Sequence, residues 1–248
     1  MSYLGLTRTI CRNYLSQIEF PKVLEIGIDT GQTAIPLIQN LSLSKERFMY
    51  TGIDILLNGD FAEQIGQFEG ITLSWAGDNL DDRSVLLFEQ NSLEWLDQNK
   101  NLDIKFDLVL VDGDHNYYTV FNELKLIQNL IKPTTLIVCD DFQGRYSNKD
   151  MFYSEREAYK DVAGMTPRQT TEKSGIKSAV IDFRDQSHLS WRVDTFGPSD
   201  PCFLYREDFL EALADPPLGT LLRDMHITFT LKGEKVAGPQ FGFLMDKK

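Results

Sequence analysis

Residues 22–33 read KVLEIGIDTGQT, and this stretch decides the fold. An apolar run, Lys22–Ile28, leads into a turn that contains two glycines, and Thr33–Leu41 then carries apolar residues at helical spacing. Pro36 falls in the first turn of that expected helix, where a proline is tolerated. The stretch therefore predicts a strand that passes into a helix through a tight loop.

The same alternation of strand and helix continues over the first two-thirds of the chain. Strands that are apolar throughout are typical of a mostly parallel sheet with helices on both faces, an α/β architecture. Such a sheet binds its ligand beyond the carboxyl ends of the strands. The further expected elements are strands at Phe48–Ile55, Phe106–Val111 and Thr135–Val138, and helices at Phe61–Phe68 and Tyr117–Ile131.

Two parts of the chain are harder to assign. Ile71–Trp75 and Val85–Phe88 both have the pattern of a strand, although only one core strand is expected there, and the sequence leaves the choice open. After Phe142 the pattern indicates an antiparallel edge and a C-terminal addition. We expect one domain over residues 1–248. Its cofactor-binding core covers about 20–145, and the remainder covers about 146–248. The candidates there are a helix near Ser154–Ala163 and strands at Ser178–Phe183, Cys202–Tyr205 and Ile227–Leu231.

The composition excludes several classes of protein. The 248 residues carry 25 Lys and Arg against 37 Asp and Glu, and the net charge of −12 argues against binding nucleic acid through bulk charge. No segment approaches the roughly 18 apolar residues of a membrane span. Three scattered cysteines favour neither a disulfide framework nor a thiolate zinc site. We expect a cytoplasmic protein with a small-molecule partner, whose C-terminal strands offer an interface for a homo-oligomer.

The loop after the first strand has the pattern ExGxxxGxT, formed by Glu25, Gly27, Gly31 and Thr33. Glycines let the backbone turn tightly and approach a ligand closely. A carboxylate at the end of a strand suits a cofactor with a cationic amino group. Asp54, at the end of the second strand, can accept hydrogen bonds from the ribose hydroxyls of a nucleoside. The alternatives are an ordinary turn with two glycines and, for Asp54, a helix cap.

This loop resembles the cofactor loop of class I S-adenosylmethionine-dependent methyltransferases more than the GxGxxG loop of dinucleotide-binding dehydrogenases. The resemblance implies a Rossmann-like fold with a seven-stranded sheet, and S-adenosyl-L-methionine as the cofactor. It also implies a contact near the adenine after the third strand. Asn91 and Ser92 are favoured for that contact, residues 77–79 are a rival placement, and a helix cap is the alternative role.

Acidic residues follow two neighbouring strands, in VDGDH at 111–115 and VCDDF at 138–142. Because these strand ends should lie side by side, their carboxylates and His115 converge. Clustered carboxylates are costly unless a cation binds or protons are taken up. Oxygen ligands suit Mg²⁺, and the absence of a Cys/His set disfavours zinc. A simpler role for Asp114 is to cap the helix that follows.

These two motifs, with KPTTLIV at 132–138 between them, resemble the Mg²⁺-dependent O-methyltransferases of the macrocin and catechol types. The resemblance implies that Asp112, Asp140 and Asp141 hold the metal, that Asp112 also contacts the cofactor, and that His115 is the catalytic general base. The catechol-type enzymes have Asn where this chain has Asp141, which leaves the ligand set open.

The acceptor implied by this resemblance is a hydroxyl of a small molecule, such as a natural product, a sugar or a catechol-like ring. From their positions after the two strand ends, Tyr117, Tyr118, Arg145 and Tyr146 are candidates for the acceptor pocket. Two alternatives share the fold: a metal-independent methyltransferase and a non-catalytic nucleoside-binding subunit. A dehydrogenase is disfavoured by the absence of GxGxxG.

Overall fold

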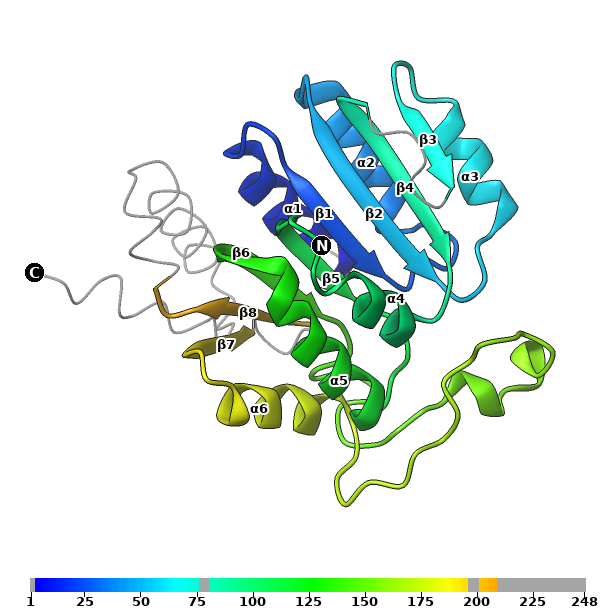
Figure 1. Ribbon diagram of the computed structural model, residues 1–248, viewed down its shortest axis with the longest axis vertical. Coiled ribbons are helices and arrows are strands. Elements are labelled where there is room, and N and C mark those ends of the chain that lie inside the picture. Colours follow the sequence, from blue (N-terminus) through cyan, green and yellow to red (C-terminus); the bar gives the residue numbers. More distant parts are fainter. Residues whose placement is uncertain (1–2, 76–80, 196–200, 209–248) are drawn as a thin grey trace, which may run out of the picture.

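The computed structural model describes residues 3–75, 81–195 and 201–208, which form one sheet between two layers of helices (Figure 1). The eight strands lie in the order β3-β4-β2-β1-β5-β6-β8-β7. All neighbours from β3 to β6 are parallel, whereas β8 runs antiparallel to both β6 and β7. The strands are β1 (Lys22–Ile26), β2 (Phe48–Asp54), β3 (Thr72–Trp75), β4 (Arg83–Glu89), β5 (Phe106–Val111), β6 (Ile131–Cys139), β7 (Trp191–Thr195) and β8 (Cys202–Arg206).

The helices divide between the two faces of the sheet, and each face has its own apolar core. On one face Leu15, Ile38 and Ile65 are buried against the sheet, and on the other Leu96, Leu124 and Phe183 are. The first layer consists of α1 (Tyr3–Ser16), α2 (Ala34–Ser44) and α3 (Gly59–Gly66), and the second of α4 (Ser92–Asn99), α5 (Tyr117–Ile127) and α6 (Ile176–Gln186). Short 3-10 turns occur at Gln128–Leu130, Tyr153–Glu155 and Glu157–Tyr159.

The predicted α/β repeat is confirmed, and both ambiguous runs prove to be strands. β4 is the core strand because it pairs with β2 on one side, and four of its seven residues are buried in succession. β3 pairs with β4 alone among the described strands, and its Trp75 is 50% exposed. The sheet therefore has eight strands where seven were expected, because β3 extends one edge.

The expectations for the C-terminal part need two corrections. The predicted strand Ser178–Phe183 is wrong, since these residues lie within α6, where Ile176, Ala179, Val180 and Phe183 are buried at helical spacing. The predicted helix near Ser154–Ala163 is also wrong, because this region contains only two 3-10 turns. The Cys202–Tyr205 strand is confirmed as β8, β7 was not predicted, and Ile227–Leu231 lies outside the described residues.

The topology brings the carboxyl ends of β1, β2, β4, β5 and β6 to one edge of the sheet. Residues 143–175, between β6 and α6, leave that edge and extend away from the sheet (yellow-green in Figure 1). This stretch is called the 143–175 segment below. Of the helices in the described ranges, none is long and apolar enough to cross a membrane.

Candidate functional site

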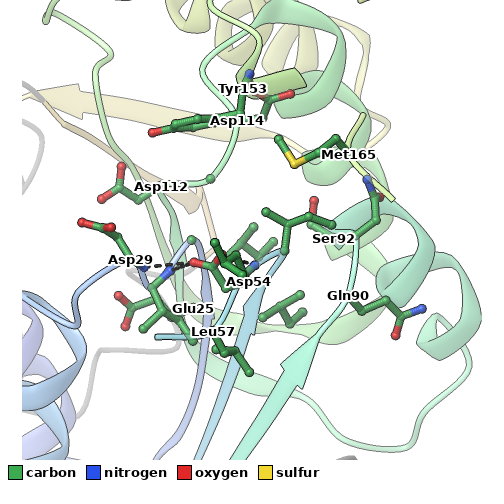
Figure 2. A pocket seen from close by; sticks show the side chains of 18 of the residues that line it. Glu25, Asp29, Asp54, Leu57, Gln90, Ser92, Asp112, Asp114, Tyr153 and Met165 are labelled. Atoms are coloured by element: carbon green, nitrogen blue, oxygen red, sulfur yellow. Dashed lines mark hydrogen bonds between the residues drawn. The ribbon is translucent and has the colours of Figure 1, made fainter. Parts of the chain in front are cut away.

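A cavity of about 630 Å³ lies at this edge of the sheet. The ends of β1, β2 and β4 and the turn after β5 line it, together with part of the 143–175 segment. Figure 2 shows acidic side chains around one part of the cavity and Ser92 and Met165 around another. The acidic residues that line it are Glu25, Asp29, Asp54, Asp112 and Asp114.

The two glycines of the loop have a positive φ and no room for a side chain. A Cβ on Gly27, whose φ is +83°, would lie 2.2 Å from the carbonyl oxygen of Asp112. A Cβ on Gly31, whose φ is +77°, would lie 2.4 Å from the ring of Phe61. Glycine is therefore required at both positions because other parts of the same chain pack against the loop. This requirement exists whether or not a ligand also approaches the loop. Thr33, at the end of the loop, lines the cavity.

Asp54 braces the glycine loop through backbone N–H groups. Its Oδ2 accepts hydrogen bonds from the N–H groups of Ile28 at 2.7 Å and Asp29 at 2.9 Å (Figure 2). Its Oδ1 accepts a third from Leu56 at 2.9 Å. Because a carboxylate accepts about four hydrogen bonds, Asp54 keeps about one acceptor position for a ribose hydroxyl. The predicted ribose contact stays a prediction, and the bracing role was not foreseen.

Glu25 is a buried acid in the wall of the cavity. It is 2% exposed, and one carboxyl oxygen accepts a hydrogen bond from the Tyr50 hydroxyl at 2.8 Å. The pKa of Glu25 is raised to about 8, mainly by burial and in part by the charge of Asp54, although the Tyr50 hydrogen bond and the charge of Arg8 oppose the shift. The side chain is therefore mostly protonated at neutral pH, and a cation placed beside it would favour its ionised form.

Asn91 and Ser92 both line the cavity, and their side chains bind other parts of the protein. Asn91 is the cap of α4: its Oδ1 accepts from two N–H groups of the first turn, at 2.9 and 3.2 Å. Its Nδ2 donates to the carbonyl of Gly164 and to the hydroxyl of Thr166, both at 2.9 Å. Ser92 donates to the buried Glu123 at 2.5 Å. Asn91 thus ties the 143–175 segment to the end of β4.

The acidic residues after β5 and β6 converge around His115, as predicted. The His115 Nδ1 atom lies 3.3 Å from Asp141 Oδ2, and its Nε2 lies 4.0 Å from Asp112 Oδ1. Desolvation and the carboxyl group of Asp140, which shares a hydrogen bond with Asp112, raise the pKa of Asp112 well above its usual value. Burial lowers the pKa of His115, although the charges of Asp141 and Asp140 oppose this shift.

Two non-glycine residues in the described ranges have a positive φ, and both lie near the cavity. They are Asp29, at +49°, and Asp141, at +55°. The left-handed region is strained for most side chains, and such strain is concentrated at functional sites. Asp141 also accepts a hydrogen bond from the N–H of Arg145 at 3.0 Å. Across the described ranges, no three His, Cys, Asp or Glu side chains are already placed to hold a metal ion together.

Comparison with known proteins agrees with this geometry. A family profile described as a methyltransferase domain matches the chain from Leu24 in β1 to Phe142, just after the acidic pair. The structure of the methyltransferase PaMTH1 from Podospora anserina, with SAH bound, superimposes with a TM-score of 0.50 at 16% identity, over 82% of this chain and 79% of that chain.

The apo structure of CalS11, a TDP-rhamnose 3'-O-methyltransferase of calicheamicin biosynthesis, gives a TM-score of 0.48 at 14% identity, over 82% of this chain and 78% of that chain. No curated protein matches the sequence.

The cavity brings together most of the predicted site residues. Gly31 is the exception among the cofactor residues, since it packs against Phe61 rather than lining the cavity. The rival adenine contact at residues 77–79 lies outside the described residues. The predicted residues that line the cavity are Glu25, Gly27, Thr33, Asp54, Asn91, Ser92, Asp112 and His115.

Two of the predicted roles need correction. The helix cap of α5 is Asn116 rather than Asp114, because the Asn116 side chain accepts from the N–H of Thr119 at 2.8 Å. Asp114 instead accepts from the N–H of Tyr153 at 3.2 Å. Tyr117 does not line the cavity, and its hydroxyl instead donates to Asp182 of α6 at 2.8 Å.

Sequence reasoning missed four residues that the 143–175 segment contributes to the cavity. Tyr153, Tyr159, Met165 and Thr166 all line it, and the first is labelled in Figure 2 above Asp114. The sequence carries no local signal for them, because the segment lacks a regular pattern and reaches the cavity through tertiary contacts. Asp29 was also missed as a lining residue, and its only signal was its position between the two glycines.

Proposed function

We propose that this protein transfers a methyl group to a hydroxyl of a small molecule with the help of an oxygen-preferring divalent cation such as Mg²⁺. The observation that carries the proposal is the contact between the carboxyl groups of Asp112 and Asp140 beside His115. Two carboxyl groups in contact must share a proton or a cation. A cation at this place would lie at the edge of the sheet where the acceptor is expected.

The cavity fits the cofactor in size and chemistry. Its volume of about 630 Å³ lies within the 300–1,000 Å³ that is typical of small-molecule sites. Glu25 provides a buried carboxyl for the cationic amino group, and Asp54 keeps an acceptor position for the ribose. Held by Glu25 and Asp54, S-adenosylmethionine would supply a methyl group for the acceptor oxygen and would leave as S-adenosylhomocysteine, with the electron pair of the broken C–S bond on sulfur.

His115 is suited to take the proton of the acceptor hydroxyl. Its lowered pKa keeps the imidazole neutral at neutral pH, so one ring nitrogen is free to accept. Asp141, 3.3 Å from Nδ1, favours the tautomer with the proton on Nδ1 and leaves Nε2 as the accepting atom. A neutral imidazole held in one tautomer is the arrangement that general-base catalysis requires.

The metal would be held by the carboxylates of Asp112 and Asp140, with Asp141 as a further ligand. These oxygen donors match the preference of Mg²⁺, and the cation would replace the proton that two contacting carboxyl groups otherwise share. When bound, the cation supplies positive charge that stabilises the negative charge developing on the acceptor oxygen.

The test is calorimetry with S-adenosylhomocysteine and Mg²⁺, each in the presence and absence of the other. We expect both to bind the wild-type protein, and Asp140→Asn to lose Mg²⁺ binding but keep S-adenosylhomocysteine binding within about twofold. Asp103→Asn, an exposed carboxylate in the turn before β5, is the matched control and should behave as wild type. Binding of S-adenosylhomocysteine without any Mg²⁺ site would favour the metal-independent alternative.

A panel of acceptors completes the test. Sugars and catechols incubated with S-adenosylmethionine and Mg²⁺ should yield a methyl ether with one of these hydroxyl classes. The net charge of −12 supports a small molecule rather than a nucleic acid as the acceptor.

A further inference from the structure

Three cationic side chains gather around one buried tyrosine of the 143–175 segment. The Arg145 guanidinium carbon lies 5.2 Å and the Lys149 Nζ atom 5.8 Å from the centre of the Tyr146 ring. Arg156 Nη2 donates to the Tyr146 hydroxyl at 2.9 Å. We call Arg145, Lys149 and Arg156 the cationic cluster.

The cationic cluster is not neutralised by ion pairs within the part of the chain that the structure describes. Other cations of the same segment are paired there: Lys160 with Glu157, and Arg168 with Glu155. No ion pair of this kind involves a member of the cluster. Exposed cations on one short segment thus differ in whether a carboxylate accompanies them.

The cluster also departs from the charge of the chain as a whole. The chain has 25 Lys and Arg against 37 Asp and Glu, whereas the 143–175 segment has six against five. The segment that reaches the cavity therefore carries a small positive excess in an otherwise acidic chain. An anionic ligand is the partner that such an excess attracts.

The cluster is one side chain away from the proposed general base. The Tyr146 ring stacks on the imidazole of His115, with 5.1 Å between the ring centres. The Arg156 guanidinium also lies 5.2 Å from the ring centre of Tyr153, which lines the cavity. Arg156 is therefore the member of the cluster that connects to the cavity, and its charge contributes to the lowered pKa of His115.

We propose that the methyl acceptor carries an anionic group, a carboxylate or a phosphate, that binds the cationic cluster while its hydroxyl lies at His115. The guanidinium groups of Arg145 and Arg156 present paired N–H donors that match the oxygens of either anion. The inference rests on the proposed function, because it extends the same site. It names a substrate class that the cofactor residues do not specify.

A different role would also explain the cluster, namely balancing the charge of Asp112, Asp140 and Asp141. The two roles predict different losses. A cluster that binds an anion loses anion affinity when it is neutralised and leaves Mg²⁺ affinity unchanged. A cluster that balances the acids changes Mg²⁺ affinity instead.

The experiment measures anion binding by calorimetry, in low salt and without Mg²⁺, on protein saturated with S-adenosylhomocysteine. Inorganic phosphate and benzoate are the two probes, so that a phosphate-bearing and a carboxylate-bearing acceptor are distinguished. We expect at least one of them to bind the wild-type protein at least tenfold more tightly than Arg156→Gln. Lys160→Gln, which removes an equal charge from the same segment, is the matched control and should bind within twofold of wild type.

A double variant, Arg145→Gln with Lys149→Gln, provides a second test if Arg156→Gln does not fold, since both side chains are exposed. The proposal is overturned if neither probe binds the wild-type protein, if Lys160→Gln loses as much affinity as the cluster variants, or if these variants change only Mg²⁺ affinity. Titration of the wild-type protein with S-adenosylhomocysteine and Mg²⁺ separates the two proposals. If the wild-type protein binds Mg²⁺ but neither anion, only the proposal of an anionic acceptor is overturned. If it does not bind Mg²⁺, the proposed metal mechanism is overturned.

Discussion

The candidate site, which comprises the cavity and the acids that follow β6 beside it, has two halves that are built in different ways. In the nucleoside half, at the ends of β1, β2 and β4, the Asp54 carboxylate is held by three backbone N–H groups, and Glu25 is buried. In the acceptor half, at the ends of β5 and β6 and on the 143–175 segment, ionisable side chains contact each other. The nucleoside half is held mainly by hydrogen bonds from the backbone, whereas the acceptor half consists of side chains that face each other.

The two halves should therefore respond differently to substitution. A site braced by backbone is largely preformed and tolerates little change in the loop itself. A site made of facing side chains changes its charge with each substitution while the fold persists. Substitutions in the two halves should therefore separate binding of the cofactor from transfer of the methyl group.

The largest effect on stability is expected at Gly27. Gly27→Ala places a Cβ 2.2 Å from the carbonyl of Asp112 at a φ of +83°, which forces β1 and β5 apart at their ends. We expect a loss of about 3 kcal/mol in the free energy of unfolding, which is roughly 6–12 °C in Tm for a domain of this size. Thermal denaturation measures it. Gly66→Ala, where nothing lies within 4 Å of the new Cβ, is the control. Equal melting of the two variants would contradict the steric argument.

The largest effect on the reaction is expected at His115. His115→Gln removes the proton acceptor, and single-turnover methyl transfer to an acceptor found in the panel should slow by about 100-fold or more. The affinity for S-adenosylhomocysteine should stay within about twofold, because His115 belongs to the acceptor half. His188→Gln, an exposed histidine after α6, should transfer at the wild-type rate. An unchanged rate in His115→Gln would show that His115 is not the general base.

An intermediate effect on cofactor binding is expected at Asp54. Asp54→Asn removes the charge that organises two N–H groups of the glycine loop and the N–H of Leu56 after β2. Hydrogen bonds to charged groups contribute about 1.5–3 kcal/mol each, so S-adenosylhomocysteine should bind about tenfold more weakly. Calorimetry against Asp103→Asn measures the difference. Wild-type affinity in Asp54→Asn would show that the loop holds its shape without the brace.

The raised pKa of Glu25 predicts that cofactor affinity depends on pH. With a pKa of about 8 in the free protein, Glu25 is protonated at pH 7, and the cationic amino group of the ligand should favour its ionised form. Binding at pH 7 should therefore release a proton, and affinity should rise as the pH rises toward 8. Calorimetry in two buffers with different ionisation enthalpies detects the proton. Glu25→Gln should abolish the release, and a wild-type enthalpy independent of buffer would refute this coupling.

The smallest effect is expected where the two halves are connected. Asn91→Asp keeps the oxygen that caps α4 and removes the N–H donor that binds the carbonyl of Gly164, whereas the Thr166 hydroxyl can donate to the new carboxylate. Losing the bond to Gly164 should cost about 1 kcal/mol, and S-adenosylhomocysteine should dissociate about fivefold faster. Stopped-flow displacement measures the rate. A rate equal to wild type would mean that the 143–175 segment does not retain the cofactor.

The nucleoside half could be predicted from the sequence because its signals are local. Apolar strands, helical spacing and the two glycines of the loop lie within a few residues of the groups they position, and Glu25 and Asp54 line the cavity as expected. The convergence around His115 could also be predicted, because consecutive parallel strands end side by side. The steric reason why glycine is needed at Gly27 and Gly31 could not be predicted, because Phe61 and the Asp112 carbonyl approach these residues only in the folded chain.

The acceptor half was only partly predictable, because its long connection has no repeating pattern. Tyr153 and Met165 reach the cavity through bonds such as that from Asn91 to Gly164, which joins residues 73 positions apart. The strand predicted at Ser178–Phe183 was wrong because its β-branched residues also fit the buried stripe of α6. A short apolar run does not by itself distinguish a strand from a buried helix.

The position of β8 between β6 and β7 has a consequence for the order in which the enzyme matures. Among the described strands, β7 meets the sheet only through β8, although it is synthesised first. While the chain emerges from the ribosome, the outer edge of β6, which precedes Asp140 and Asp141, has no neighbour until residues 202–206 arrive. The strands of the nucleoside half are already paired by then. The strands around the cofactor pocket can thus pair before residues 202–206 are synthesised, whereas the edge of β6 that precedes Asp140 and Asp141 is covered only afterwards.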